Sequence, residues 1–215
     1  MIFDLSPLID DRLKVWPGDT PPGRQLLCDI ASGSNITLST LRATVHLGSH
    51  VDGPNHYSAA APGVEAWPLE RFWGPCHVVD APVARAAGGA RVRIADLRTP
   101  VAAIHHPRVL LKTGTFPDFR DFNEDFAGLE PALIDALAAR GVQLIGLDTP
   151  SVDVFTSKDL PAHAACLRHS IAILEGLVLR DVMPGEYELC AMPLKLANFD
   201  ASPVRAALRP LPRGA

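Results

Sequence analysis

Twenty prolines are spread along this chain of 215 residues, and they limit the length of any regular element it can form. Proline lacks a backbone N–H, so it interrupts helix interiors and is confined to the edges or ends of strands. The segments between the prolines alternate between strand-like and helix-like patterns, with no internal repeat. We therefore predict one α/β domain over residues 1–215, in which short elements are joined by many ordered loops.

Six segments carry the clearest secondary-structure patterns. Residues 129–141 predict a helix, because Pro131 suits a first helical turn and Gly141 suits the position after the last one. Residues 161–170 also begin with proline and predict a helix. Short apolar or β-branched runs bounded by proline or glycine predict strands over 35–47, 75–83, 107–114 and 142–148.

The composition argues against several classes of protein. A net charge of −4 without a long run of Lys or Arg gives no electrostatic footprint for nucleic acid. No window approaches the ~18 consecutive apolar residues of a membrane span, and the first residues lack the pattern of a secretory signal. The four cysteines lie far apart with no CxxC spacing, which favours free thiols over a disulfide framework. We expect a cytoplasmic protein without nucleic-acid or membrane partners.

Residues 45–57, VHLGSHVDGPNHY, hold three of the eight histidines. A helix would place His46 and His50 on one face, as in zinc helices of the HExxH type, but the glycines, proline and β-branched residues of this stretch disfavour a helix. In an extended chain His50 and Asp52 point to the same side, and a bend at Gly48 would bring His46 there too. Two imidazoles and one carboxylate suit zinc. A solvated loop that happens to be rich in histidine is the alternative.

The spacing of these residues, H-x3-H-x-D-x-P-x-H, resembles the signature of the metal-dependent cyclase family, to which the kynurenine formamidases belong. In this chain the pattern consists of His46, His50, Asp52, Pro54 and His56. Further resemblance lies in VWPGD (15–19), GVQLIGLDTPSVD (141–153) and HAACLRHSIAILEGL (163–177), so it covers nearly the whole chain. The resemblance implies a β-rich core flanked by helices, in a swivelling β/β/α-like arrangement.

The resemblance also implies a cofactor and the residues that serve it. One zinc ion would be held by His46, His50 and Asp52. A second zinc ion would be completed by His163, with Asp52 and Glu175 bridging the two ions. His56 would act as a proton shuttle, and Trp16 would line the substrate pocket.

His163 and Glu175 can share a metal centre only if the chain turns between them. Twelve residues of continuous helix would separate the two side chains by about 18 Å along the axis. We therefore expect the helix to end near His169 and residues 171–174 to return as an extended segment. His169 itself is expected to be a capping or supporting residue. The remaining histidines are expected to be structural or exposed: His77, His105 and His106.

For such a family member the implied reaction is zinc-dependent hydrolysis of N-formylkynurenine to kynurenine and formate, in tryptophan degradation. Zinc lowers the pKa of a bound water to about 7; the resulting hydroxide would attack the formyl carbon while His56 moves the proton that the leaving nitrogen needs. The G-x-S-x-G elbow of serine hydrolases and the Gly-rich phosphate loops are absent from the sequence. Two alternatives remain: a related hydrolase of isatin-like cyclic amides or other small acyl compounds, and a metal-binding protein without turnover.

Two further segments bear on the pocket and on assembly. The phenylalanines at Phe116, Phe119, Phe122 and Phe126 recur at three and four residues, which indicates either a core-facing stripe or a wall of the pocket.

The resemblance implies a homodimer. The Pro- and Arg-containing tail, residues 201–215, is expected to be either loose or wrapped around a partner subunit.

Overall fold

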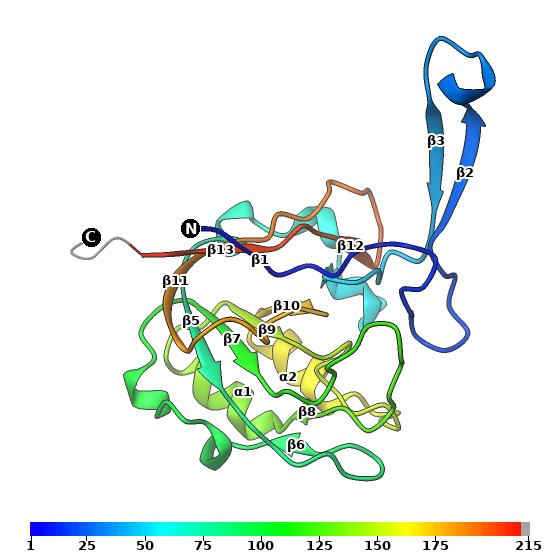
Figure 1. The fold of residues 1–215 in the computed structure, drawn as a ribbon. Helices are drawn as coiled ribbons and strands as arrows, with labels where there is room; N and C mark the ends of the chain where they lie inside the picture. Colours follow the sequence, from blue (N-terminus) through cyan, green and yellow to red (C-terminus); the bar gives the residue numbers. More distant parts are fainter. Residues whose placement is uncertain (212–215) are drawn as a thin grey trace.

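Within residues 1–211, which the computed structural model describes, nine strands form one curled sheet (Figure 1). In spatial order these are β1 (Phe3–Asp4), β13 (Ala207–Pro210), β11 (Gly185–Cys190), β5 (Trp73–Asp80), β7 (Arg108–Lys112), β9 (Leu144–Leu147), β10 (Ala172–Glu175), β4 (His50–Asp52) and β12 (Ala201–Pro203). The same part of the chain forms two separate strand pairs, β2 (Gly23–Cys28) with β3 (Leu38–Arg42), and β6 (Arg91–Val92) with β8 (Gly128–Leu129).

The centre of the large sheet is parallel and its flanks are antiparallel. Strands β5, β7, β9 and β10 run parallel, whereas β11 and β4 pair with this block in the antiparallel sense. Parallel strands are covered on both faces, so they consist of nearly continuous apolar runs. This explains why the strands predicted over 75–83, 107–114 and 142–148 are confirmed, with somewhat narrower bounds.

Two α-helices lie on one face of the sheet, α1 (Pro131–Ala138) and α2 (Pro161–Arg168) (Figure 1). Leu133 and Leu137 of α1 share one buried apolar cluster with Ile145 of β9 and Ile173 of β10. Both predicted helices are confirmed, and α2 ends at Arg168 with His169 as its C-cap, as expected. The α/β prediction with a β-rich core is likewise confirmed.

The opposite face of the sheet is covered by a second apolar cluster, which includes Val51 of β4 and Leu174 of β10. Side chains alternate along a strand. Because Val51 points into this second cluster, its neighbours His50 and Asp52 point to the helix side of the sheet. By the same alternation Glu175, next to Leu174, also points to the helix side.

The short remaining helices are single 3-10 turns. Those of residues 1–211 are η1 (Ile30–Ser32), η2 (Pro54–His56), η3 (Val64–Ala66), η4 (Leu69–Arg71), η5 (Ile94–Asp96) and η6 (Val101–Ala103). Across this part of the chain, every helix falls short of the length and apolarity that a membrane crossing requires.

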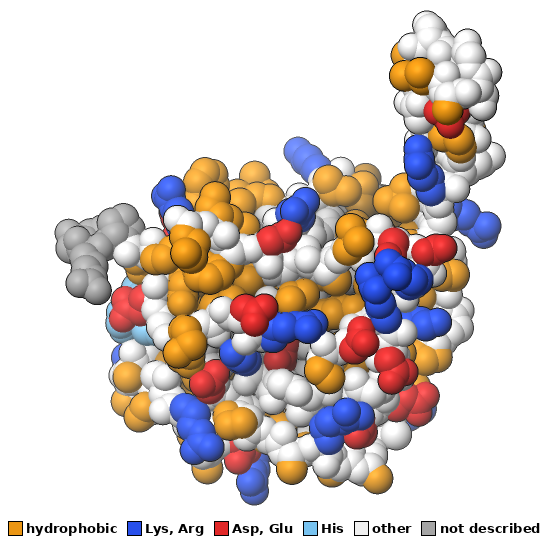
Figure 2. Space-filling view, in the orientation of Figure 1, with side chains coloured by type: hydrophobic (Ala, Val, Ile, Leu, Met, Phe, Trp, Pro, Cys, Tyr) orange, Lys and Arg blue, Asp and Glu red, His pale blue; other side chains and the backbone are white. Residues whose placement is uncertain are grey.

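Two segments differ from the sequence-based expectation. The predicted strand 35–47 is regular only over β3, which pairs with β2 in a hairpin that projects from the body and exposes apolar side chains (Figures 1 and 2). The expected loose or partner-wrapping tail instead supplies β12 and β13 to the large sheet, where Leu208 is buried and paired between β1 and β11. Residues 212–215 of that tail lie outside the described part of the chain.

Candidate metal centre

Two neighbouring strands bring three titratable side chains together on the helix side of the sheet. The antiparallel register places Glu175 of β10 directly opposite His50 of β4. The Nε2 atom of His50 lies 3.2 Å from Oε2 of Glu175 and 3.6 Å from Oδ1 of Asp52. All three side chains are buried. The prediction that His50 and Asp52 share one side of an extended segment is confirmed.

His46 reaches the same point because the chain bends just before β4. Gly48 adopts a φ of +57°, a left-handed conformation that glycine tolerates best. The bend brings Nδ1 of His46 to 3.3 Å from Oδ1 of Asp52. On the other side of the ring, Nε2 lies 3.1 Å from Oδ2 of Asp200, just before β12. His46 thus bridges a buried and a half-exposed carboxylate.

His163 enters from the first turn of α2. Its backbone N–H and its ring Nδ1 both contact Oδ2 of the buried Asp153, the ring at 2.8 Å. This contact fixes the tautomer in which Nδ1 carries the proton. The opposite nitrogen, Nε2, lies 3.6 Å from Oδ2 of Asp52. The expected turn between α2 and β10 is therefore present, and it brings His163 and Glu175 to one site.

Several buried polar atoms in this cluster lack hydrogen-bond partners. They are Nε2 of His50 and both carboxylate oxygens of Asp52. Buried polar atoms are nearly always paired, so this exception indicates that an ion satisfies them. His50 contacts the carbonyl of Gly48 through Nδ1 at 3.0 Å, which leaves the Nε2 lone pair free in the way typical of metal-ligating histidines. His46, His50 and Asp52 offer ligand atoms within 4.8 Å of one another, so the residues fit a divalent metal ion.

The pKa shifts of the cluster also fit a site for a divalent cation. Burial of the ring opposes protonation, but contact with Asp52 and the charge of Glu175 raise the pKa of His46 to about 9. Burial also opposes protonation of His163, yet its contacts with Asp153 and Asp52 raise its pKa to about 10. Burial raises the pKa of Glu175, helped by the nearby charge of Asp52. Without an ion, the carboxylates are therefore balanced by two protonated imidazoles, which a divalent cation would replace.

These shifts predict a pH dependence for the stability of the metal-free protein. The folded pKa values of His46 and His163 lie above the ordinary value of 6.5, so their stabilising contribution is complete below about pH 6.5. It is lost as the pH rises through 9 and 10. The unfolding temperature of chelator-treated protein should fall across this window, and zinc-loaded protein should lose this dependence. A metal-free unfolding temperature that stays level or rises would contradict the assignment.

His56 lies at the mouth of the cluster, at the end of η2. Its ring centroid is 4.3 Å from that of His46 and 6.0 Å from that of His163. Partial burial lowers its pKa, so the neutral ring that can accept a proton prevails at neutral pH. One of its nitrogens lies within 4.8 Å of ligand atoms of Asp52 and His163. His56 is nonetheless more exposed than the buried ligands around it.

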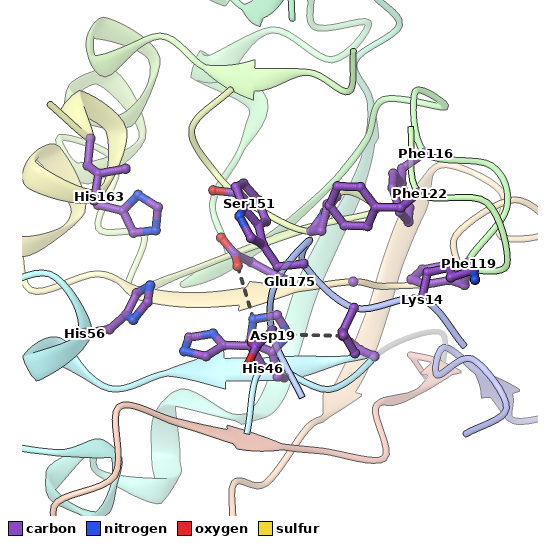
Figure 3. Close-up of a pocket in the computed structure, with 17 residues that line it drawn as sticks. Lys14, Asp19, His46, His56, Phe116, Phe119, Phe122, Ser151, His163 and Glu175 are labelled. Carbon is purple, nitrogen blue, oxygen red and sulfur yellow. Dashed lines mark hydrogen bonds and ion pairs between the residues drawn. The ribbon is translucent and has the colours of Figure 1, made fainter. Parts of the chain in front are cut away.

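A cavity of about 250 Å³ opens onto this cluster and is walled by aromatic side chains. Trp16, which the resemblance implied as a residue of the substrate pocket, lies in this wall, with its ring 4.9 Å from that of Phe155. Figure 3 shows His46, His56, His163 and Glu175 around one side of the space and three phenylalanines on the other. Both interpretations of the phenylalanine stripe hold in part. Phe126 is fully buried, whereas the wall contains Phe116, Phe119 and Phe122.

The structure also brings in residues that the sequence did not single out. Asp153 orients His163, and Asp200 contacts both His46 and, at 3.8 Å, His56. Asp153 is the last residue of the segment 141–153, in the loop that follows a buried strand. Functional residues often lie beyond the carboxyl ends of such strands, so Asp153 could have been proposed from the sequence. Asp200 carried no such signal, because only the pairing of β12 with β4 brings it to the centre.

A comparison with known protein families identifies the family of this chain. The model of the family named Cyclase matches residues 3–154, about 70% of the chain (152 of 215 residues). The chain belongs to the Cyclase family. The family resemblance drawn from the histidine spacing is thereby confirmed at this level.

Several solved structures have a similar fold over nearly the whole chain. One, described as a potential metal-dependent hydrolase with cyclase activity, is 27% identical with a TM-score of 0.79, over 97% of this chain and 96% of that one. Another, described as a predicted metal-dependent hydrolase from Bacillus stearothermophilus, is 25% identical with a TM-score of 0.75, over 97% of each chain. An isatin hydrolase bound to the product analogue thioisatinate shares the fold, with 21% identity and a TM-score of 0.79. The match covers 98% of this chain and 92% of that one.

Proposed function

We propose that this member of the Cyclase family is a metal-dependent hydrolase, and that its substrate is N-formylkynurenine. The observation that carries the proposal is the set of unpartnered, buried atoms of His50 and Asp52 facing an aromatic-walled cavity. Two of the solved structures described above are themselves described as metal-dependent hydrolases, which supports the general class.

The ligand set divides around Asp52. His46 and His50 lie on the side of its Oδ1 atom, and they would hold one zinc ion. His163 lies on the side of Oδ2 and would hold a second zinc ion, with Glu175 completing the bridge. A bound zinc ion supplies Lewis acidity, which lowers the pKa of a water and polarises a carbonyl oxygen.

His56 is the residue that we assign to proton transfer. Its ring is neutral at neutral pH and reaches the space between the ligands and the cavity. It can therefore accept a proton from the attacking water and pass it to the nitrogen of the scissile amide. Asp200, 3.8 Å from Nδ1 of His56, would steady the charged ring during the transfer. A protein that only binds metal has no use for such a residue.

The cavity offers features that match an aryl formamide carrying an amino-acid group. Trp16 and the phenylalanine wall suit the aromatic ring of the substrate. Lys14 and Asp19 line the same cavity with opposite charges. We assign Lys14 to the α-carboxylate of the substrate and Asp19 to its α-ammonium group. Isatin has neither of these charged groups, which makes the pair a discriminating feature.

A substrate panel on zinc-loaded protein tests this proposal. We expect the highest kcat/KM for N-formylkynurenine, ahead of isatin and phenyl acetate. Lys14→Ala should raise the KM for N-formylkynurenine roughly 10-fold or more, because a hydrogen bond to a charged group is lost, and should leave phenyl acetate hydrolysis unchanged. Faster hydrolysis of isatin would instead identify the chain as the alternative, a hydrolase of cyclic amides. No turnover of any of the three would favour a metal-binding protein.

We also propose that the chain forms a homodimer. The projecting hairpin exposes several large apolar side chains, including Leu26, Leu38 and Leu41, and a second copy of the chain would cover them. Sedimentation analysis should give twice the chain mass of 23.0 kDa. A Leu41→Glu variant should shift the mass toward that of one chain. A wild-type mass of one chain at working concentration would contradict the dimer.

A further inference from the structure

A second group of potential metal ligands lies at the surface, on residues that the proposed hydrolase does not use. We call it the surface histidine cluster; its members are His77, His105, His106 and Glu186. Each offers a ligand atom, and all four atoms lie within 4.8 Å of one another. From the sequence we expected these histidines only to be structural or exposed, because the members of the cluster come from three separate parts of the chain.

The sheet and one loop assemble the surface histidine cluster. Antiparallel pairing of β5 with β11 places His77 directly opposite Glu186, so both side chains lie on one face. His105 and His106 follow η6 and immediately precede β7, the parallel neighbour of β5. The ring centroids of the three histidines are 4.3 to 4.6 Å apart.

A backbone hydrogen bond of His105 leaves one ring nitrogen of the cluster with a free lone pair that faces the carboxylate of Glu186. His105 contacts the carbonyl of Ala103 through Nδ1 at 3.0 Å, so this nitrogen donates and Nε2 is left as the acceptor. That Nε2 lies 3.8 Å from Oε1 of Glu186. Nε2 of His106 lies 3.1 Å from Oε2 of the same carboxylate. In ligating histidines the nitrogen that does not bind the metal typically donates to a carbonyl or carboxylate, as Nδ1 of His105 does here. His106 would exchange its contact with Glu186 for one with the ion.

We propose that His105, His106 and Glu186 bind a divalent transition-metal ion, with Zn²⁺ as the reference case. Imidazole and carboxylate ligands suit zinc, copper and nickel. Ligand atoms around a tetrahedral zinc ion lie about 3.4 Å apart, so the present separations need only a small closing movement. The backbone N–H of His105 donates to Nε2 of His77, so that buried ring supports the loop and does not coordinate.

The position of this site sets its properties. His105 and Glu186 are exposed, with 55% and 50% of their side chains accessible, so an ion can enter and leave without unfolding. Figure 2 shows histidine beside acidic side chains at the left edge of the molecule, the side on which β5 and β11 lie in Figure 1. An ion there would tie β11 to the loop that precedes β7. We therefore expect it to bind more weakly than at the buried centre and to stabilise the fold without affecting catalysis.

Zinc titration of tag-free protein by equilibrium dialysis tests this site. Wild-type protein should bind one zinc ion per chain beyond those of the buried centre. His105→Ala should weaken this additional ion at least ~10-fold, since loss of even a supporting group costs that much, and should leave hydrolysis unchanged. Glu186→Gln, which keeps the shape of the side chain, should have the same effect. His169→Ala, which removes an exposed histidine elsewhere, serves as the matched control and should bind zinc like wild type.

A second background separates this site from the buried centre. In Asp52→Asn, which lacks the central carboxylate of the buried centre, the ion of the surface site should remain, and adding His105→Ala should remove it. With Co²⁺ in place of zinc, the visible absorption of the Asp52→Asn protein should likewise disappear in the double variant. Wild-type protein that binds no additional ion would overturn the proposal, as would an additional ion that persists unchanged in both His105→Ala and Glu186→Gln.

Discussion

Replacing His56 with alanine should lower hydrolysis of N-formylkynurenine by about two to four orders of magnitude, the usual contribution of a general acid–base group. The ring lies beside His46 at the mouth of the cluster and is more exposed than the buried ligands, so metal content and folding should stay nearly intact. When an aryl formamide is cleaved, the nitrogen of the departing aryl amine cannot leave as an anion and must receive a proton. Esters with good leaving groups need none, so their hydrolysis should fall less.

His169→Ala is the matched control for this variant. The side chains of His56 and His169 are both 36% exposed, but His169 caps α2 and pairs with Asp135 on the surface. It should therefore keep full activity and metal content. If His56→Ala loses its metal, His56 is a ligand and its proposed role is wrong. If His56→Ala keeps full activity on the formamide, the proton comes from another group.

Replacing Asp52 with asparagine should disturb both metal positions and abolish hydrolysis. The carboxylate faces His46 and His50 through one oxygen and His163 through the other, so its loss affects both halves of the cluster. Asparagine keeps the shape but removes the charge that compensates a divalent cation. His163→Ala should remove one ion preferentially, because only the Oδ2 side of Asp52 loses its partner. Metal analysis of the dialysed variants checks both expectations.

Asp200→Asn is the control for the removal of a carboxylate near the centre. Asp200 contacts His46 but is half exposed, so its loss should leave both ions in place. Two outcomes would contradict the ligand assignment: full metal content in Asp52→Asn, or equal loss of both ions from His163→Ala. Circular dichroism of each variant separates loss of metal from loss of fold.

The local parts of the fold and of the centre could be predicted from the sequence. Glycine and proline within residues 45–57 excluded a helix, and alternation along an extended segment then put His50 and Asp52 on one side. The family resemblance implied that His163 and Glu175 serve one centre, and helix geometry then required a turn near His169, because a continuous helix would have held them about 18 Å apart. Each of these inferences depends on geometry within a few residues, which the sequence determines closely.

The long-range parts could not be predicted in this way. The contact between Glu175 and His50 depends on the register of two strands more than a hundred residues apart, and the position of Asp200 depends on the pairing of β12 with β4. The tail 201–215, which contains several proline and arginine residues, was expected to be either loose or wrapped around a partner subunit. Its short strands instead complete the sheet, since backbone pairing and burial of Leu208 outweigh composition.

Stepwise reloading of chelator-treated protein with zinc, followed by N-formylkynurenine hydrolysis at each step, tests most directly whether the buried cluster is a catalytic metal centre. We predict no turnover without metal, and a rise that levels off at two tightly bound zinc ions per chain. Full turnover by the metal-free protein, or zinc binding that leaves turnover unchanged, would contradict this conclusion.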